Sequence, residues 1–374
     1  MIDVARRLWL NLRADRRRPP LARLEALEAP ERFVEAVLPY AARSFSLCIA
    51  LLPRRTSRAL AVAYLYCRML DTCEDLPATA DLKAAKLEAF LARFDALERT
   101  SGAPIGPAPT IAADRARDAA ERVYLLLLDR AARVDAEFLA LPPRQRAAIL
   151  RLVGRMGEGM LWAVRTFAAQ EGALADDGQL ARYCFGVLGN PIVFADEMQR
   201  LECGVEPAEP DAARIALAAS VGEAVQLANV ARDLEKDCAR GVFYLPELRR
   251  APPGELPGAI ASARRRLLAR ALALGRAFQP FLAGIPSPAF SLARGAALLM
   301  ALFTLAFWQE TARRLGLELH SRRYRITPAR SVALVACAVF SRRGYDAALA
   351  RLDRIFAEAA ERLAAWSAPS WSVH

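Results

Sequence analysis

Apolar residues recur three or four positions apart along most of this 374-residue chain, which is the spacing that places them on one face of an α-helix. Alternating runs of β-branched residues, which indicate half-buried strands, are absent. The pattern therefore predicts an all-α protein. Helices are expected at residues 31–52, 54–76, 81–99, 114–139, 143–170, 176–200, 211–239, 258–283, 287–315 and 327–365, the last one broken near Arg342–Gly344.

Short segments rich in proline and glycine separate these helices, for example Ser101–Pro109, Cys203–Pro210 and Arg250–Pro257. None of them is long enough to act as a flexible linker between domains, and no internal repeat of fixed period is found. We therefore expect a single helical domain over residues 31–366, preceded by a basic N-terminal segment over residues 1–30.

The longest apolar run, Gly295–Trp308, has fourteen residues, whereas a membrane-spanning helix needs about 20. This run predicts a buried core helix, and no transmembrane segment is expected. Residues 1–20 are amphipathic and rich in arginine, without the apolar stretch of a signal peptide. These features predict a cytoplasmic protein. The N-terminal segment suits either contact with an anionic membrane surface or exposure to solvent.

Arginine dominates the charge of the chain. There are 52 Lys plus Arg against 41 Asp plus Glu, a net charge of +11, and lysine occurs only at positions 83, 86 and 236. Such a surplus favours phosphate groups or an anionic membrane as partners, although a GC-rich coding sequence also produces it. No basic stripe interleaved with aromatic residues occurs, so no nucleic-acid partner is expected.

The number and spacing of the histidines and cysteines exclude several common kinds of catalytic and metal site. Only two histidines occur, which excludes most His-based metal sites and Ser-His-Asp catalysis, and His320 is predicted to lie in a surface loop. The seven cysteines form no CxxC pair and are expected to be reduced and mostly buried.

Two carboxylates stand four residues apart near the end of the helix predicted over residues 54–76. Asp71 and Asp75 therefore project from one helical face, with Tyr64 and Arg68 further along the same face. The preceding residues, Ala59–Leu70, are mostly apolar, which indicates that this face points into the protein. A single acidic pair of this kind is most often solvated helix surface.

A second pair changes this interpretation. Asp233 and Asp237 repeat the spacing on the helix predicted over residues 211–239, after the largely apolar segment Val221–Val230. Two inward-facing acidic pairs cannot neutralise one another, so they need a cation between them. Oxygen ligands without histidine or cysteine favour Mg²⁺.

Mg²⁺ usually completes its coordination shell with water and with the phosphates of a substrate. The two acidic pairs therefore predict a substrate that carries a diphosphate. Arg43, Arg68 and Arg232 could hold the diphosphate oxygens through paired N–H donors.

These residues stand in motifs that resemble those of the squalene/phytoene synthase family, the head-to-head prenyl transferases. The segment Ala42-Arg43-Ser44-Phe45 is similar to the family's Ser-Arg-Ser-Phe segment. Tyr64–Asp75 resembles the first aspartate-rich motif, in the Asp-Thr-x-Glu-Asp form typical of squalene synthases. Further resemblance is found at Arg155–Met160, at Tyr183-Cys184, and at Gln226–Asp237 with the tail Gly241–Pro246. The motifs keep the family order over roughly residues 35–345.

The resemblance implies the isoprenoid synthase fold, a single helical bundle around a central cavity with acidic motifs at its mouth and apolar walls below. It also implies a role for each matching residue. The metal ligands would be Asp71, Asp75, Asp233 and Asp237, and the catalytic residues Tyr64, Arg68, Tyr183 and Arg232. The substrate-binding residues would be Arg43, Ser44, Phe45, Leu188, Gln226, Asn229 and Arg240.

The reaction implied by the resemblance is the Mg²⁺-dependent joining of two prenyl diphosphates, expected to be farnesyl diphosphate, with release of pyrophosphate. The first product is presqualene diphosphate, which squalene synthases reduce to squalene with NADPH. Two alternatives remain. One is an enzyme of the same fold that stops at presqualene diphosphate or makes dehydrosqualene or phytoene without NADPH. The other is a non-catalytic relative that serves as an assembly factor, against which the four intact carboxylates count.

The chain departs from the family pattern after Tyr183-Cys184. Leu188 stands where the family has alanine and Ile192 where it has glycine, so this part of the cavity is expected to be narrower. Pro191 is a candidate for the bend that the small residues usually allow. In the tail, Val242 stands where the family has an arginine. Arg240 could take the place of that arginine beside the diphosphate.

Overall fold

The computed structural model describes residues 2–76, 78–99, 103–205, 211–323 and 325–365. Within these ranges every regular element is a helix, apart from one isolated bridge between Ala173 and Phe243. This confirms the predicted all-α fold class.

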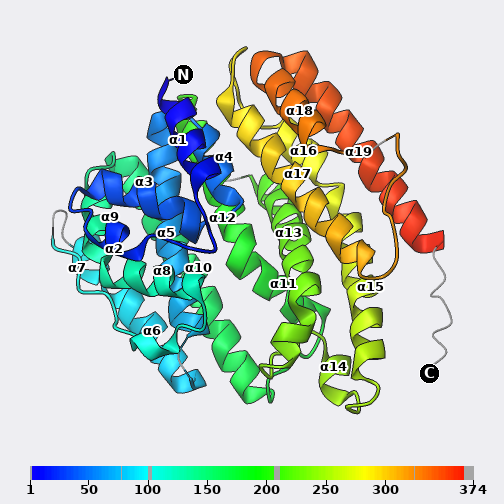
Figure 1. Cartoon of the computed structure of the whole chain (residues 1–374), viewed down its shortest axis with the longest axis horizontal. Helices are drawn as coiled ribbons and strands as arrows, with labels where there is room; N and C mark the ends of the chain where they lie inside the picture. Colours follow the sequence, from blue (N-terminus) through cyan, green and yellow to red (C-terminus); the bar gives the residue numbers. More distant parts are fainter. Residues whose placement is uncertain (1, 77, 100–102, 206–210, 324, 366–374) are drawn as a thin grey trace.

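The helices of the first part of the chain are α1 (Ile2–Arg13), α2 (Leu21–Glu25), α3 (Pro30–Ala41), α4 (Phe45–Leu51), α5 (Arg54–Asp75), α6 (Ala80–Ala92), α7 (Asp95–Arg99), the 3₁₀ turn η1 (Ala113–Arg115), α8 (Ala119–Asp129), α9 (Ala131–Leu139) and α10 (Pro143–Ala169). The second part holds α11 (Asp177–Cys184), the π-helical turn η2 (Phe185–Gly189), α12 (Asn190–Glu202), α13 (Ala212–Cys238), α14 (Pro246–Arg250), α15 (Leu256–Gly275), α16 (Phe278–Ala283), α17 (Leu292–Arg313), α18 (Pro328–Phe340) and α19 (Arg342–Ala365). Figure 1 shows the long helices running side by side as a bundle.

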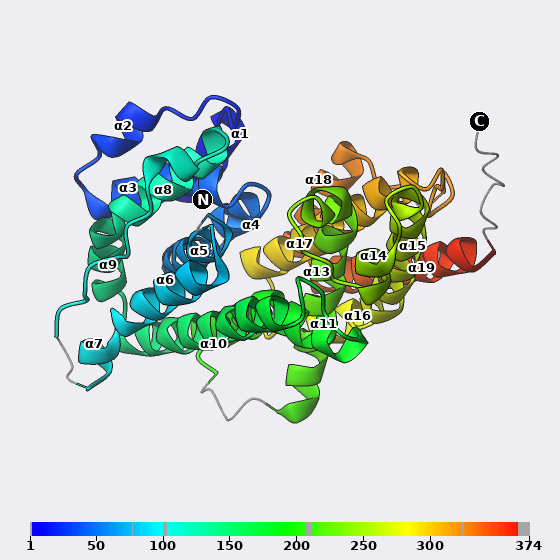
Figure 2. The same ribbon diagram turned by 90° about the horizontal axis from the view of Figure 1, so that it is seen from below.

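Two large hydrophobic cores hold this bundle together, and a third, small cluster consists of Leu52, Ala293 and Ala296. One core joins α3, α5, α6, α8, α9 and α10 around the fully buried Tyr66, whose ring packs edge-on against Phe94 and Phe138. The other joins α13, α15, α16, α17 and α19. Figure 2 shows α1–α9 on one side of the molecule and α13–α19 on the other. The space between the two cores is where a cavity can form.

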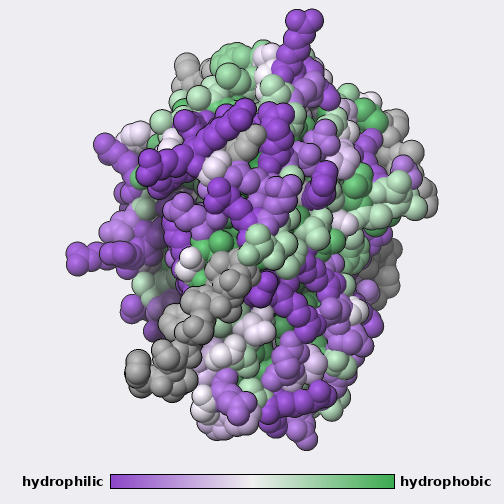
Figure 3. Space-filling view, turned by 90° about the vertical axis from the view of Figure 1, so that its right-hand side faces the viewer, coloured by the Kyte–Doolittle hydropathy of each residue, from purple (hydrophilic) through white to green (hydrophobic). Residues whose placement is uncertain are grey.

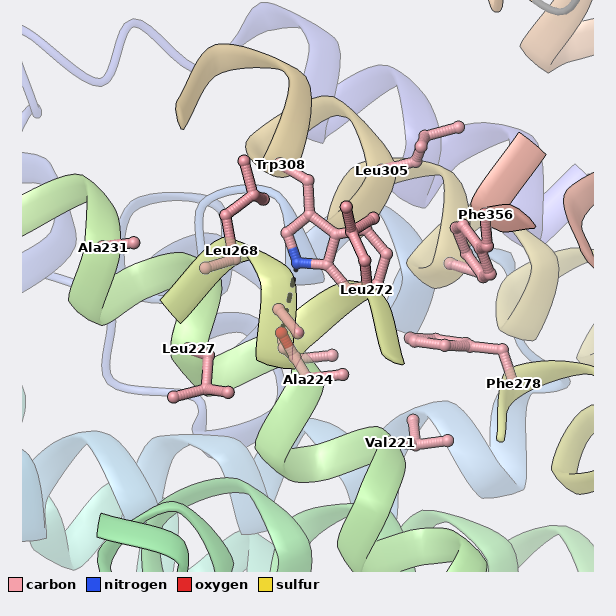
Figure 4. Packing of buried hydrophobic residues seen from close by; sticks show 14 of the residues in the cluster. Val221, Ala224, Leu227, Ala231, Leu268, Leu272, Phe278, Leu305, Trp308 and Phe356 are labelled. Carbon is pink, nitrogen blue, oxygen red and sulfur yellow. Dashed lines mark hydrogen bonds between the residues drawn. The ribbon is translucent and has the colours of Figure 1, made fainter. Parts of the chain in front are cut away.

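Trp308 of α17 is the largest fully buried side chain of the second core (Figure 4). Its indole N–H donates a hydrogen bond of 3.2 Å to the carbonyl of Ala224 on α13, and its ring lies 5.1 Å from that of Phe356. Gly275 of α15 allows this approach, because a Cβ there would lie 2.6 Å from the indole ring. By length and composition α17 could cross a membrane, and 56% of its apolar window is buried inside the bundle. The core helix predicted at Gly295–Trp308 is thus observed.

The N-terminal segment is largely helical and is attached to the bundle. Arg6 of α1 forms an ion pair of 2.7 Å with Glu35 of α3, and Arg7 donates to the carbonyl of Leu52, just beyond α4. The predicted helix over 31–52 is broken, because the chain turns at Ala42–Ser44 between α3 and α4.

The predicted helix over 176–200 contains a π-helical turn, η2, in its middle. Glycines fit this turn between two neighbouring helices. A Cβ on Gly159 of α10 would lie 3.0 Å from the Cα of Gly186, and one on Gly222 of α13 would lie 2.6 Å from the backbone nitrogen of Gly189. The π turn thus lies directly before Pro191, which is in the first turn of α12, and the bend expected from Pro191 stays a prediction.

His320 was predicted to be a surface histidine, and this is wrong. Its side chain is 8% exposed, and burial lowers its pKa. The segment that contains it folds back on the bundle, since the backbone N–H groups of Leu319 and Ser321 donate to Gln309 of α17 and Glu358 of α19. All seven cysteines are free thiols, and four of them are buried.

Candidate active site

A cavity of about 1180 Å³ lies between the two cores. It is lined by α4 and α5 from the first part of the chain and by η2, α12, α13 and α17 from the second. All the site residues predicted from the sequence line this one cavity, namely Arg43, Ser44, Phe45, Tyr64, Arg68, Asp71, Asp75, Tyr183, Leu188, Gln226, Asn229, Arg232, Asp233, Asp237 and Arg240. The structure thus gathers residues that are up to about 200 positions apart in the chain.

The first acidic motif ends α5, where the inward face of the helix changes from apolar to charged. Arg68 forms an ion pair of 3.0 Å with Asp71, one turn further along, and donates a 3.0 Å hydrogen bond to the hydroxyl of Tyr64. Its guanidinium also lies 4.7 Å from the centre of the Tyr124 ring. The Nε of Arg68 is buried and has no partner among the described residues. This arginine therefore keeps a donor available for an anion in the cavity.

The carboxylates of this motif repel one another in a poorly solvated place. Burial, with the charge of Asp75 acting in the same direction, raises the pKa of Asp71 to about 6 despite the opposing Arg68. Burial and the charges of Asp75 and Asp71 raise the pKa of Glu74 to about 8. Such a cluster gains from any cation that enters it.

The second acidic motif lies on α13. Arg232 donates two hydrogen bonds, of 2.9 and 2.7 Å, to the carboxylate of Asp233. Although burial opposes it, this contact lowers the pKa of Asp233. One turn further, burial and the charge of Asp233 raise the pKa of Asp237 to about 6. Upstream on the same helix, the amide of Asn229 donates to Gln226 at 3.2 Å.

The two motifs line the same cavity, and their charges interact across it. Asp75 of α5 contributes to raising the pKa of Asp237 on α13, although burial and Asp233 contribute more. Among the described residues, no three His, Cys, Asp or Glu side chains are grouped so that they could hold a metal ion by themselves. Hard oxygen donors with unneutralised charge on both sides fit Mg²⁺, provided that other ligands fill the rest of its coordination shell.

Arg43 occupies a strained backbone position between α3 and α4. Its φ angle is +48°, in the left-handed region that a non-glycine residue rarely adopts. The Ser46 hydroxyl and the Arg16 guanidinium both donate to the Arg43 carbonyl, which stabilises this conformation. The next residues begin α4, and the ring of Phe45 lies 6.1 Å from that of Tyr64. Strain of this kind is often found at functional sites.

Three aromatic residues form a cluster at the boundary between the charged and apolar parts of the cavity. The hydroxyls of Tyr183 and Tyr244 are 3.3 Å apart, and the ring of Phe167 packs edge-on against both. Burial raises the pKa of each tyrosine well above its usual value, so both hydroxyls stay protonated at neutral pH. They can therefore donate a hydrogen bond to an anion while their rings face the cavity.

Several cavity residues were missed by the sequence analysis. Tyr244 stands in the tail that resembles the family, so the reasoning applied to Tyr64 and Tyr183 would have found it. Arg68 lies over the ring of Tyr124 in α8, and Arg232 lies over the ring of Phe307 in α17. Both aromatic residues belong to apolar runs of the sequence, where no local pattern distinguishes them. Glu74 was included in the first motif but was given no role.

The deeper walls are apolar, and two of the departures from the family pattern lie there. Leu188 is half-buried on the cavity wall, and Ile192 lines the same wall and packs into the second core. Val242 also lines the cavity, and the exposed Arg240 lies near its mouth. Leu188 and Ile192 thus line the cavity, and the narrowing expected from their bulk stays a prediction.

The helical bundle with one large central cavity is the isoprenoid synthase fold. The chain belongs to the squalene/phytoene synthase family, whose sequence profile matches residues 38–330. It is 28% identical over 231 residues to squalene synthase BSS of Botryococcus braunii and 30% identical over 231 residues to squalene synthase 1 of Arabidopsis thaliana. These alignments cover 62% and 61% of this chain but only 44% and 49% of the relatives, so the chain spans about half the length of the curated relatives that it matches.

A solved structure with the same fold is that of TcSQS with the ligand BPH1237. It superposes with a TM-score of 0.63, covers 90% of this chain and 99% of that chain, and is 18% identical in sequence. TcSQS with the ligand E5700 gives a TM-score of 0.61 at 19% identity. At this identity the likeness establishes the fold alone.

Proposed function

We propose that this chain is a prenyl transferase that joins two prenyl diphosphates head to head, with Mg²⁺ as cofactor and pyrophosphate as a product. One observation carries the proposal. Two acidic pairs on α5 and α13, each accompanied by an arginine, line one large cavity that is otherwise largely apolar, and their charges interact across it. A diphosphate with a long hydrocarbon tail matches both parts of this cavity.

Asp71, Asp75, Asp233 and Asp237 would hold Mg²⁺, each pair supplying one or two oxygen ligands. When bound, the metal would neutralise charge on a diphosphate and so make it a better leaving group. Burial, together with the charge of a neighbouring carboxylate, raises the pKa values of Asp71 and Asp237, and this supports the assignment because a bound cation would offset both effects.

The arginines would bind the diphosphate and stabilise the charge that develops when it leaves. Arg68 has a buried Nε without a partner, and Arg232 could exchange its contact with Asp233 for a phosphate oxygen. Arg43 lines the same end of the cavity in its strained conformation. The protonated hydroxyls of Tyr183 and Tyr244 would add hydrogen-bond donors.

Loss of the diphosphate leaves an allylic carbocation, which the double bond of the second substrate attacks to form a new cation. Loss of a proton from this cation to the released pyrophosphate then closes the cyclopropane ring of presqualene diphosphate. The walls around it would exclude water, and the faces of Phe45, Tyr64, Phe167 and Tyr183 would stabilise positive charge without reacting with it. Gln226 and Asn229 on α13 would position the second diphosphate at the mouth.

We propose more specifically that the substrate is farnesyl diphosphate and the product squalene, formed through presqualene diphosphate with hydride from NADPH. The Asp-Thr-x-Glu-Asp form of the first motif and the names of the matching relatives support squalene. The bulk of Leu188 and Ile192 supports the fifteen-carbon substrate rather than the twenty-carbon one.

The test is mass spectrometry of the products formed from farnesyl and geranylgeranyl diphosphate, with and without NADPH and Mg²⁺. We expect squalene from farnesyl diphosphate with NADPH, and presqualene diphosphate or dehydrosqualene without it. Asp71→Asn and Asp233→Asn should each lower turnover by orders of magnitude. Asp353→Asn, on α19 outside the cavity, should leave it unchanged. Absence of any coupled product, or full turnover by either motif variant at saturating Mg²⁺, would contradict the proposal.

A further inference from the structure

The outward face of α18 is a continuous apolar stripe. Its exposed residues, apart from Arg330 and the proline that begins the helix, are Ala329, Val332, Ala333, Ala336, Cys337 and Phe340. Val332 is 70% exposed and Phe340 66%. The ring of Phe340 lies 5.4 Å from that of Phe290, which is itself 43% exposed. We call these residues, with Phe290, the α18 stripe.

The α18 stripe is not left over from core packing, because the core uses the opposite face of the helix. Ala338 and Val339 are buried against the bundle, and Gly295 of α17 allows close contact, since a Cβ there would lie 2.5 Å from Val339. Figure 3 shows the side of the molecule formed by α15 and α19, where hydrophilic residues are spread between the hydrophobic ones. A long apolar stripe on such a protein marks an interaction surface.

The sequence around the stripe is rich in arginine, and one acidic residue, Asp346, stands just beyond it in an ion pair with Arg342. From Ser321 to Tyr345 the sequence contains six arginines and no Asp or Glu. Arg325 and Arg330 are exposed at the beginning of α18, and Arg343 is exposed just after its end. A positive surface at both ends of an apolar helix fits a partner that is apolar inside and negative at its boundary.

A second amphipathic helix lies at the same end of the bundle. Trp9 and Leu12 of α1 are 51% and 76% exposed, and the guanidinium of Arg13 lies 4.3 Å from the centre of the Trp9 ring. Exposed arginines follow at positions 16–18. Helix α1 packs on α4, α4 on α17 and α17 on α18, and Figure 1 shows α1, α4 and α18 at one end of the molecule.

We propose that the α18 stripe, with its flanking arginines, docks on the surface of an anionic lipid bilayer, with α1 as a second contact. A second copy of the chain is a poorer occupant. Two copies joined through this face about a two-fold axis would bring their arginines together, and the adjacent carboxylate, Asp346, is already paired with Arg342 of its own chain. Anionic lipid headgroups neutralise these arginines while the acyl region accepts Val332 and Phe340.

Docking in this way would also bring the cavity close to the bilayer. The helix beneath the stripe, α17, lines the cavity with Ala296, Ala297 and Met300 on its other side. Two helices, α18 and α17, would therefore separate the lipid surface from the apolar interior. The docking proposal does not depend on the proposed reaction and can be tested without substrate.

The experiment is co-sedimentation of the full chain with vesicles of phosphatidylcholine alone and of phosphatidylcholine mixed with phosphatidylglycerol. We expect binding to the anionic vesicles only, and weaker binding as salt is added. Val332→Glu with Phe340→Glu should lower the affinity on the order of tenfold or more. The matched control is Leu82→Glu with Leu139→Glu, which are exposed leucines on α6 and α9 and should leave binding unchanged.

Circular dichroism would reveal whether the glutamate substitutions disturb folding. If they do, two arginine variants test the proposal instead. Arg330→Gln and Arg343→Gln should each weaken binding about fivefold, because each arginine removed loses one contact with charged lipid. Equal binding to both kinds of vesicle, or binding insensitive to the stripe and arginine variants, would overturn the proposal. So would a stable dimer in sedimentation equilibrium that Val332→Glu dissociates, because the stripe would then be a protein interface.

Discussion

The contact between α13 and the π turn η2 gives a quantitative prediction at Gly222. A Cβ at this position would lie 2.6 Å from the nitrogen and 2.7 Å from the Cα of Gly189, and 2.9 Å from the carbonyl carbon of Leu188. These are backbone atoms, so no rotation of a side chain relieves the overlap. On the other side η2 is in contact with α10 through Gly159. Gly222→Ala must therefore push α13 and the turn apart.

Two opposing effects set the magnitude. Replacing a glycine inside a helix by alanine stabilises the fold by about 0.5–1 kcal/mol when the methyl group meets nothing. Overpacking of a well-filled site costs about 1–3 kcal/mol. The free energy of unfolding should therefore fall by about 0.5–2 kcal/mol in Gly222→Ala. Turnover should fall as well, because α13 carries Asp233 and Asp237 and η2 carries Leu188.

Gly154→Ala is the matched control. Gly154 is also inside a long helix, α10, but a Cβ there would meet nothing within 4 Å. This variant should be more stable than the wild type by about 0.5–1 kcal/mol, with unchanged turnover. Urea unfolding followed by circular dichroism measures both variants in the same buffer. If Gly222→Ala is stabilised as much as Gly154→Ala, the close packing of α13 against η2 is wrong.

Three further predictions concern the cavity. The pKa values of Asp71 and Asp237 are raised to about 6, so in the folded state these groups bind protons at pH values where they are ionised in the unfolded chain. This proton binding stabilises the folded state at low pH, and the stabilisation is lost as the pH rises through about 6. Mg²⁺ with pyrophosphate should therefore raise the melting temperature more at about pH 7.5 than at about pH 5, and an equal rise at both would contradict the metal assignment. Leu188→Ala should change the ratio of products from farnesyl and geranylgeranyl diphosphate with a stability loss below the roughly 2–5 kcal/mol of a fully buried leucine, whereas a lower melting temperature with the same products would mean that Leu188 only fills space. Arg68→Lys should weaken inhibition by pyrophosphate on the order of tenfold, because lysine lacks the planar pair of donors, and unchanged inhibition would exclude Arg68 from the diphosphate site.

The features predicted correctly from the sequence are those set by local spacing. The separation of Asp71 from Asp75, and of Asp233 from Asp237, predicted one helical face for each pair, and both pairs line the cavity. The apolar run Gly295–Trp308 predicted a core helix for a similar reason, since a helix without a polar face must be buried. The roles of the individual side chains and the division of the chain at residue 31 remain predictions.

The features that were missed depend on contacts between distant segments. Tyr124 is one of many apolar and aromatic residues in α8 until Arg68 of α5 is placed over its ring. His320 is buried because Leu319 and Ser321 bond to two other helices, which no local pattern reveals. The π turn adds one residue to a helical turn and leaves the apolar spacing almost unchanged. The spacing therefore predicted an uninterrupted helix over this segment.

The separation of the bundle into two hydrophobic cores has a mechanical consequence. Asp71 and Asp75 move with the core around Tyr66, whereas Asp233 and Asp237 move with the core around Trp308. A cation and a diphosphate bound between the pairs would act as a crosslink across this seam, and their binding energy would oppose any relative displacement of the two sides. Loosening of either core by heat or by a distant substitution would then widen the gap between the pairs while both cores stayed folded. Catalysis would fail at a lower temperature than the fold itself, and the difference would shrink as the concentration of substrate rises.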